Sequence, residues 1–169
     1  MFSIRIWHWF NFLLIAGLLL TVLLRKTFLS YKTNGLLIQN KLMELNMTIS
    51  IDDAKNIAKA IRTPMWDWHY YLGFALALFF IYRIFIGFKN LKIDKSFDGI
   101  RHATYALFYI LLGFMVISGV TLYFVKVEFL KELHEISMFF FVAFIPIHII
   151  GVIVHERKYG NVLSKMIKE

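Results

Sequence analysis

Six histidines stand out in the chain, because each lies within or at the edge of a long apolar stretch. They are His8, His69, His102, His134, His148 and His155. A polar, ionisable side chain inside a membrane costs at least a few kcal/mol, and such residues commonly mark functional sites. Neutral imidazole nitrogen is a good ligand for iron, copper and zinc. These histidines are therefore candidate ligands for a metal or a metal cofactor.

Two of the histidines, His134 and His148, belong to one apolar stretch, HEISMFFFVAFIPIHIIGVIVH. On an α-helix they are about four turns apart, so they project from the same face with a rise of about 21 Å. Two cofactors can therefore be stacked along this helix, one near each membrane surface. Each cofactor then needs a second ligand, at a similar depth, from another helix.

Two other histidines supply these second ligands. His69, at the start of the second apolar stretch, is level with His134, while His8 lies on the side of the membrane where His148 must be. Two imidazoles on opposite faces of an iron hold a haem six-coordinate and favour electron transfer over oxygen chemistry. The pattern therefore indicates two haem sites, His8 with His148 and His69 with His134. A zinc site would need about four ligands at one point rather than two layers.

Plainer interpretations of the same residues remain open. IWHWF around His8 and MWDWHYY around His69 are also typical of an aromatic belt at a membrane surface, where a histidine needs no metal. His155 shares the stripe of His148 and is its substitute as a ligand, although the charged residues after it place it at the headgroups. His102, at the start of the third stretch, is a candidate contact for a haem propionate, a quinone or the interface alone.

Helices that cross a membrane are needed to position these residues. Of the 169 residues, 59% are hydrophobic and 18% aromatic, and the mean hydropathy of +0.65 lies outside the ordinary soluble range. About 20 helical residues cross the hydrocarbon layer, where open strands would leave backbone groups unsatisfied. The expected fold is all-α, an integral membrane four-helix antiparallel bundle, with residues 1–169 forming a single transmembrane domain. The four expected spans are residues 6–24, 66–88, 102–125 and 134–155.

Proline and glycine inside the spans indicate where helices bend or come close. Pro146 removes a backbone donor and is expected to kink the fourth helix just before His148. Glycines allow a neighbouring helix or a flat macrocycle to approach, and we favour helix packing. The glycines within spans are Gly17, Gly73, Gly113, Gly119 and Gly151.

The connection over residues 25–65 is the longest. Ser50 with Asp53 three residues later is typical of a capping box, and Ile57, Ala58 and Ile61 then share one helical face. The upstream piece LLIQNKLMEL is also amphipathic. We expect short amphipathic helices here, which either cover the bundle end or the interface or form a docking surface for a partner.

Composition limits the cofactor and the partners. The chain has no cysteine, so a haem would be held without covalent attachment, as haem b, and neither a disulfide nor a thiolate ligand is expected. The net charge of +8 is explained by a basic rim against anionic lipid, so nucleic acid is not an expected partner. Lysine and arginine are equally numerous at the two ends of the expected bundle, so charge alone leaves its orientation open.

With this pattern, the chain resembles the bacterial cytochrome b561 family and the related b-type cytochrome subunits of nickel-iron hydrogenases. The marks of the resemblance are RIWHWFN, WDWHYYLGF, RHATYALFYILLGFMVISG and HIIGVIVHERKYGNVLSKM in the four spans, with the spacing of His134 and His148. The resemblance implies a four-helix bundle with two haems b and both termini in the cytoplasm. By position, His8 and His148 would hold the inner haem, and His69 and His134 the outer haem.

The resemblance also implies a function in the bacterial cytoplasmic (inner) membrane. Electrons would pass between the quinone pool of a respiratory chain and a periplasmic redox partner, such as a c-type cytochrome or a dehydrogenase or hydrogenase subunit. The chain would act as an electron-transfer protein, as a quinone oxidoreductase or as the membrane subunit of a dehydrogenase. Membrane lipid and a second copy of the chain are further candidate partners. Candidate contacts for quinone or propionates are Arg5, Arg101, His102 and Tyr105.

Two other classes of protein stay open at this point. A proton or metal-ion transporter could use the histidine stripe as a relay, but it would be expected to have acidic residues in mid-span, which this sequence lacks. A passive membrane anchor would carry the histidines incidentally. The haem content of the purified protein distinguishes these classes.

Overall fold

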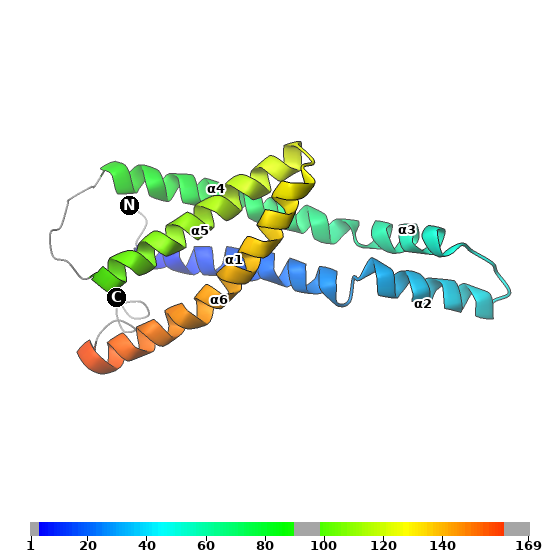
Figure 1. Ribbon diagram of the computed structural model, residues 1–169, viewed down its shortest axis with the longest axis horizontal. Helices are drawn as coiled ribbons and strands as arrows, with labels where there is room; N and C mark the ends of the chain where they lie inside the picture. Colours follow the sequence, from blue (N-terminus) through cyan, green and yellow to red (C-terminus); the bar gives the residue numbers. More distant parts are fainter. Residues whose placement is uncertain (1–3, 90–98, 161–169) are drawn as a thin grey trace. The chain divides into compact units, whose positions relative to one another are not determined.

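The computed structural model describes residues 4–89 and 99–160, and this part of the chain is built from helices. In chain order these are α1 (Ile4–Lys26), α2 (Tyr31–Glu44), α3 (Ile51–Ile61), α4 (Thr63–Lys89), α5 (Gly99–Phe124) and α6 (Glu128–Tyr159) (Figure 1). Four of them, α1, α4, α5 and α6, are long and apolar enough to cross a membrane. The predicted all-α membrane fold with four spans is confirmed.

Backbone contacts divide the chain into two compact units. The first, called the α5–α6 unit, consists of Met1–Phe10 and Leu76–Glu169, so it includes the first turns of α1 and the second half of α4. The second, called the α2–α3 unit, is Asn11–Ala75 and includes the rest of α1 and the first half of α4. The two long helices α1 and α4 therefore contribute side chains to both units.

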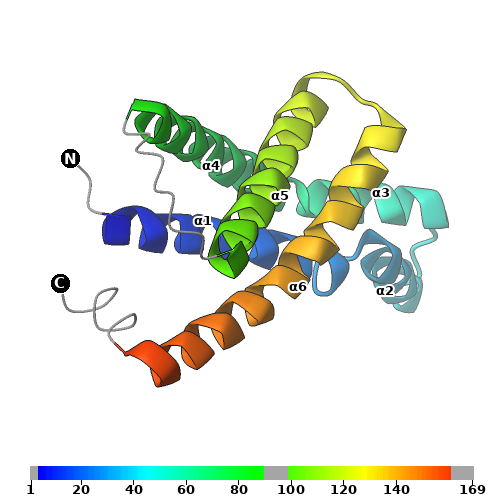
Figure 2. The same cartoon turned by 60° about the vertical axis from the view of Figure 1, so that its left-hand side comes forward.

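Helices α5 and α6 form an antiparallel pair that is joined by a short connection and diverges away from it (Figures 1 and 2). Phe108 of α5 packs against Phe141 and Phe144 of α6. Leu112, one turn further along α5, is fully buried. These apolar contacts fix which residues of the two helices lie opposite each other.

Helix α6 is longer than the span predicted from residue 134 onward. It begins at Glu128, and an ion pair between Glu128 and Lys131 stabilises its first turn. The charged residues before His134 end the apolar stretch but do not end the helix, so the helix extends beyond the predicted span. The helix continues through Pro146, and its ribbon changes direction part-way along, as expected for a helix that contains a proline (Figure 1).

The long first connection contains the helices α2 and α3. These helices pack against each other through small residues, since Gly35 of α2 and Ala54 and Ala58 of α3 are all buried. The predicted N-cap is also confirmed, because Asp53 donates its backbone N–H to Ser50 Oγ at 3.1 Å. Small residues at the contact allow the two helix backbones to come close.

The exposed side of α3 carries the isoleucines. Ile57 is 42% exposed and Ile61 57% exposed, so of the predicted face of Ile57, Ala58 and Ile61 only Ala58 is buried. The alanines pack against α2 instead, because the approach at Gly35 leaves no room for larger side chains: a Cβ at Gly35 would lie 3.1 Å from Lys55 Cα. The isoleucines are left on the outside of the helix pair.

Candidate functional site

The structure brings His8 and His148 together. Both belong to the α5–α6 unit and are half-buried, and their ring centroids lie 6.2 Å apart with the ring planes tilted by 42°. An imidazole nitrogen lies about 2 Å from a metal that it ligates, and the ring centre lies about 1 Å further back, so two axial imidazoles on one iron have centres about 6 Å apart. The observed spacing therefore fits two ligands on opposite sides of one metal.

Aromatic side chains contact both rings of this pair. His148 stacks on Phe144 with centroids 5.9 Å apart and planes within 17° of parallel. His8 meets Trp9 edge to face at 5.8 Å. Phe144 is itself buried against Phe108 of α5. These contacts restrict the rotation of the imidazoles and surround them with apolar groups, which lowers the local dielectric.

Arg83 of α4 lies beside the same region and was missed by the sequence reasoning. Its guanidinium lies 5.3 Å from the ring centre of Trp7, the residue before His8, and its Nε donates a hydrogen bond to Tyr109 Oη at 3.2 Å. The signal was a single arginine deep inside the stretch 66–88, whose other charged residue, Asp67, lies at its start. A fixed positive charge here can compensate the negative charge of a carboxylate-bearing cofactor.

His134 of α6 contacts a buried hydroxyl on α5. Its Nδ1 lies 2.7 Å from Ser118 Oγ, and Ser118 is only 2% exposed. The residue after this serine is Gly119, where an added Cβ would lie 3.1 Å from Cε1 of the His134 ring. Helix α5 therefore supplies both a hydrogen-bond partner and the space in which the imidazole packs.

His69 of α4 has a similar environment in the α2–α3 unit. Its Nδ1 lies 2.7 Å from Thr21 Oγ1 of α1, and Thr21 is 6% exposed. Trp66 packs edge to face against the His69 ring at 5.6 Å. His69 and His134 belong to different units, so their predicted pairing on one haem stays a prediction.

A cluster of basic and aromatic side chains lies next to His69 in the same unit. Arg25 lies over Trp66 at 5.3 Å, while Arg62 and Lys59 lie 5.0 Å and 5.4 Å from the ring centre of Tyr31. Burial and the neighbouring Arg25 lower the pKa of Arg62, although an arginine stays protonated at any physiological pH. Sequence reasoning used these charges only to judge orientation, because their gathering around two rings depends on the fold.

The other predicted site residues lie on three of the long helices. Arg5 is half-buried in the first turn of α1, and Tyr105 is exposed on α5. His155 is half-buried in the last turns of α6. Arg101 and His102 belong to the first turn of α5, and their side chains lie outside the described residues.

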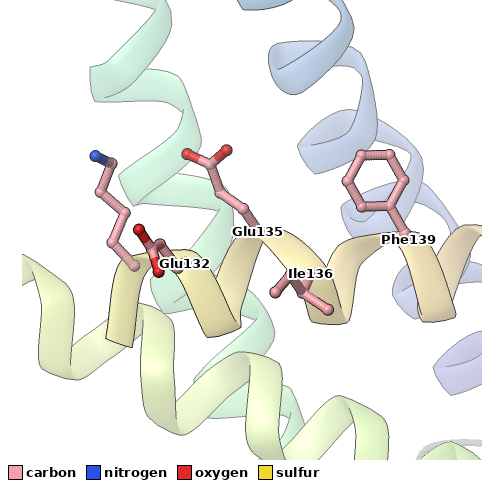
Figure 3. A pocket seen from close by; sticks show the side chains of 5 residues that line it. Glu132, Glu135, Ile136 and Phe139 are labelled. Atoms are coloured by element: carbon pink, nitrogen blue, oxygen red, sulfur yellow. The ribbon is translucent and has the colours of Figure 1, made fainter. Parts of the chain in front are cut away.

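A shallow groove of about 300 Å³ lies along the first turns of α6 (Figure 3). It is lined by Lys131, Glu132, Glu135, Ile136 and Phe139. Figure 3 shows Glu135 and Phe139 projecting from the same side of the helix. Because all five residues come from one helix and carry charges of both signs, the groove has no feature that selects a particular ligand.

These observations define a class of protein, a helical membrane protein in which two histidines from different spans lie at a distance that suits a shared metal. A comparison with protein families gave a match to prokaryotic cytochrome b561 over residues 2–169, and the chain belongs to this family. Comparisons with curated proteins and with solved structures gave no match. The protein is therefore a multi-pass bacterial membrane protein, a b-type cytochrome that binds haem b and takes part in electron transfer.

Proposed function

We propose that the protein is a di-haem cytochrome b of the inner membrane, which passes electrons between the quinone pool and a periplasmic redox partner. In this proposal both termini are cytoplasmic, His8 and His148 hold the inner haem, and His69 and His134 hold the outer haem. The observation that carries the proposal is the 6.2 Å separation of the His8 and His148 rings. It supports a shared iron, because two axial imidazoles need about this spacing.

Bound haem b supplies one-electron cycling of iron between its ferrous and ferric states. The histidine side chains of this chain would supply the nitrogen ligands, and their neighbours would hold them in place. His8 and His148 would both ligate the iron of the inner haem, and a haem held by two imidazoles would favour electron transfer over oxygen chemistry. Phe144 stacks on His148 and Trp9 contacts His8, so neighbouring aromatic side chains help to hold both imidazole rings in orientation.

The arrangement of α6 supports two sites at different depths. His134 and His148 lie on this one continuous helix, about four turns apart, with a rise of about 21 Å. The hydrocarbon layer is about 30 Å thick. Two irons with these ligands would together connect the two membrane surfaces, which is what electron transfer across a membrane requires.

The haem content of the full-length protein tests the di-haem proposal. We expect two haems b per chain from a pyridine haemochrome assay, and two components in a redox titration of the reduced-minus-oxidised optical spectrum. One haem per chain would mean that one ligand pair is misassigned. A colourless protein from cells amply supplied with haem would overturn the proposal.

Reduction by a quinol tests the quinone half of the proposal separately. A water-soluble quinol should reduce the haems of the purified protein in detergent, and the rate should saturate with quinol concentration. Dithionite, which needs no binding site, is the control reductant. Reduction by dithionite but not by any quinol would leave the haem sites in place and remove quinone as the electron donor.

A further inference from the structure

We infer that Thr21 and Ser118 are positioning residues, whose hydroxyls fix the tautomer and orientation of His69 and His134. The inference rests on the proposed function, because it takes these two histidines as haem ligands. Each hydroxyl comes from a different helix than its histidine, and each is almost fully buried. Both imidazoles are half-buried, and a buried hydroxyl beside a half-buried imidazole has few alternative partners, so the hydrogen bond between them is well defined.

The direction of the Ser118 hydrogen bond follows from counting protons. Ser118 Oγ lies 2.6 Å from the carbonyl oxygen of Phe114 and 2.7 Å from Nδ1 of His134. A serine hydroxyl has one proton to donate, and a carbonyl oxygen can only accept. The proton therefore goes to Phe114, and Ser118 Oγ accepts the Nδ1–H of His134. A neutral imidazole with its proton on Nδ1 keeps the lone pair on Nε2, so Nε2 is the atom left for iron.

Thr21 repeats this arrangement in the other unit. Its Oγ1 donates to the carbonyl oxygen of Leu18 at 2.6 Å and lies 2.7 Å from Nδ1 of His69. Because the threonine hydroxyl also has only one proton to donate, Thr21 Oγ1 accepts the Nδ1–H of His69, and Nε2 of His69 keeps its lone pair. Two separate pairs of helices thus give the same tautomer at the two histidines assigned to the outer haem.

The hydrogen bond also changes the imidazole as a ligand. An acceptor at Nδ1–H holds the ring in one orientation and raises the basicity of the ligating nitrogen. A more basic ligand stabilises ferric iron more than ferrous iron, so it lowers the midpoint potential of the haem. Among the described residues, no hydroxyl bonds to His8 or His148, so the inner haem is expected to lack this effect and serves as an internal reference.

The chain offers matched controls for both hydroxyls. Thr27 Oγ1 donates to the carbonyl of Leu23 at 2.7 Å, and Thr121 Oγ1 donates to the carbonyl of Ile117 at 2.8 Å. Both threonines are exposed, and neither bond involves a histidine. Substitutions at these positions remove the same kind of hydroxyl-to-carbonyl bond without touching a ligand.

The experiment measures haem content, midpoint potentials and the EPR spectrum of the oxidised full-length protein. In Thr21→Val and Ser118→Ala we expect the affinity for the outer haem to fall roughly 10- to 100-fold, as for other partners of metal ligands. We also expect the outer haem's potential to rise and its EPR signal to shift, with the inner haem unchanged. If the affinity for haem falls tenfold in the ferric state alone, the midpoint potential rises by about 59 mV. Thr27→Val and Thr121→Val should match the wild type.

The outcomes separate this inference from the haem assignment. If His69→Ala and His134→Ala each lose one haem, but Thr21→Val and Ser118→Ala keep wild-type potentials and EPR spectra, the positioning role is wrong and the ligands are right. If the histidine variants keep both haems, the ligand assignment itself fails. Thr21→Ser keeps the hydroxyl and should keep the wild-type potential. A shift in this conservative variant would overturn the inference even if Thr21→Val does not fold.

Discussion

The imidazole rings of His8 and His148 lie 6.2 Å apart, centre to centre, although the two residues come from near opposite ends of the chain. The first turns of α1 are held in the α5–α6 unit by other contacts as well. Phe10 stacks on Phe79 with centroids 5.6 Å apart, and Arg83 lies over Trp7. The histidine pair therefore depends on tertiary packing, and it can be tested one side chain at a time.

We predict that His148→Ala removes one haem per chain, whereas His155→Ala keeps both. His148 faces His8 at a spacing suited to a shared iron, while His155 lies further along α6, in its last turns. Haem per chain and the redox titration are measured for each variant. If His155→Ala loses a haem and His148→Ala does not, the inner pair is misassigned.

We predict that Gly119→Ala lowers the content of the outer haem while the helix itself tolerates the change. Helix propensity alone favours alanine over glycine by about 1 kcal/mol. The new methyl group would lie 3.1 Å from Cε1 of His134, so the ring must move to accommodate it. Haem per chain reports the loss, and thermal unfolding followed by circular dichroism reports the fold.

Gly151→Ala is the matched control for this substitution, because nothing lies within 4 Å of a Cβ built at this glycine. It should keep both haems with wild-type potentials. A Gly119→Ala protein with a full complement of haem and unchanged potentials would contradict the role of this glycine.

We predict that Arg83→Gln lowers the midpoint potential of the inner haem and leaves that of the outer haem unchanged. Removing a positive charge from this region favours ferric iron, which carries one more positive charge than ferrous iron. The variant also loses the cation–π contact with Trp7, so we expect a stability loss of about 1 kcal/mol. Arg83→Lys keeps the charge and should keep the potential, so a potential that falls equally in both variants would rule out the electrostatic explanation.

We predict that Gly35→Ala separates α2 from α3 without affecting either haem. The added Cβ would lie 3.1 Å and 3.2 Å from the backbone Cα and N of Lys55, and backbone atoms cannot move aside as a flexible side chain can. Overpacking of this kind costs about 1–3 kcal/mol. Limited proteolysis within residues 45–50 should be faster in this variant than in the wild type. Gly73→Ala is the control, because no atom lies within 4 Å of a Cβ built at Gly73, and it should be cut at the wild-type rate.

The features that repeat along the sequence were predictable, and those that depend on which helix faces which were not. Long apolar runs and the Ser50 cap are local signals, and both were confirmed. The start of α6 at Glu128 was not predictable from the apolar stretch, because charged residues end a membrane span without ending a helix. The exposed positions of Ile57 and Ile61 follow from the close approach at Gly35, which the periodicity of one helix cannot reveal.

In the candidate site, too, local features were predictable and features that depend on helix packing were not. The depth of His8 and His148 could be counted along the sequence, and the structure brings these two residues together. Thr21 and Ser118 could not be singled out, because serine and threonine are ordinary in membrane helices and only the packing shows which of them meets a histidine. Arg83 was overlooked for another reason, since one charge hardly changes the hydropathy of a long window.

Pro146 lies between the two histidines of α6, and its missing N–H leaves the carbonyl of Val142 without its usual helical partner. In a straight helix, the angular offset between His134 and His148 is fixed at about 40°. The bend removes that restriction, because the two halves of α6 can tilt differently. Each imidazole can thus be aligned with its own macrocycle plane, and one continuous helix can serve two cofactors whose planes are not parallel.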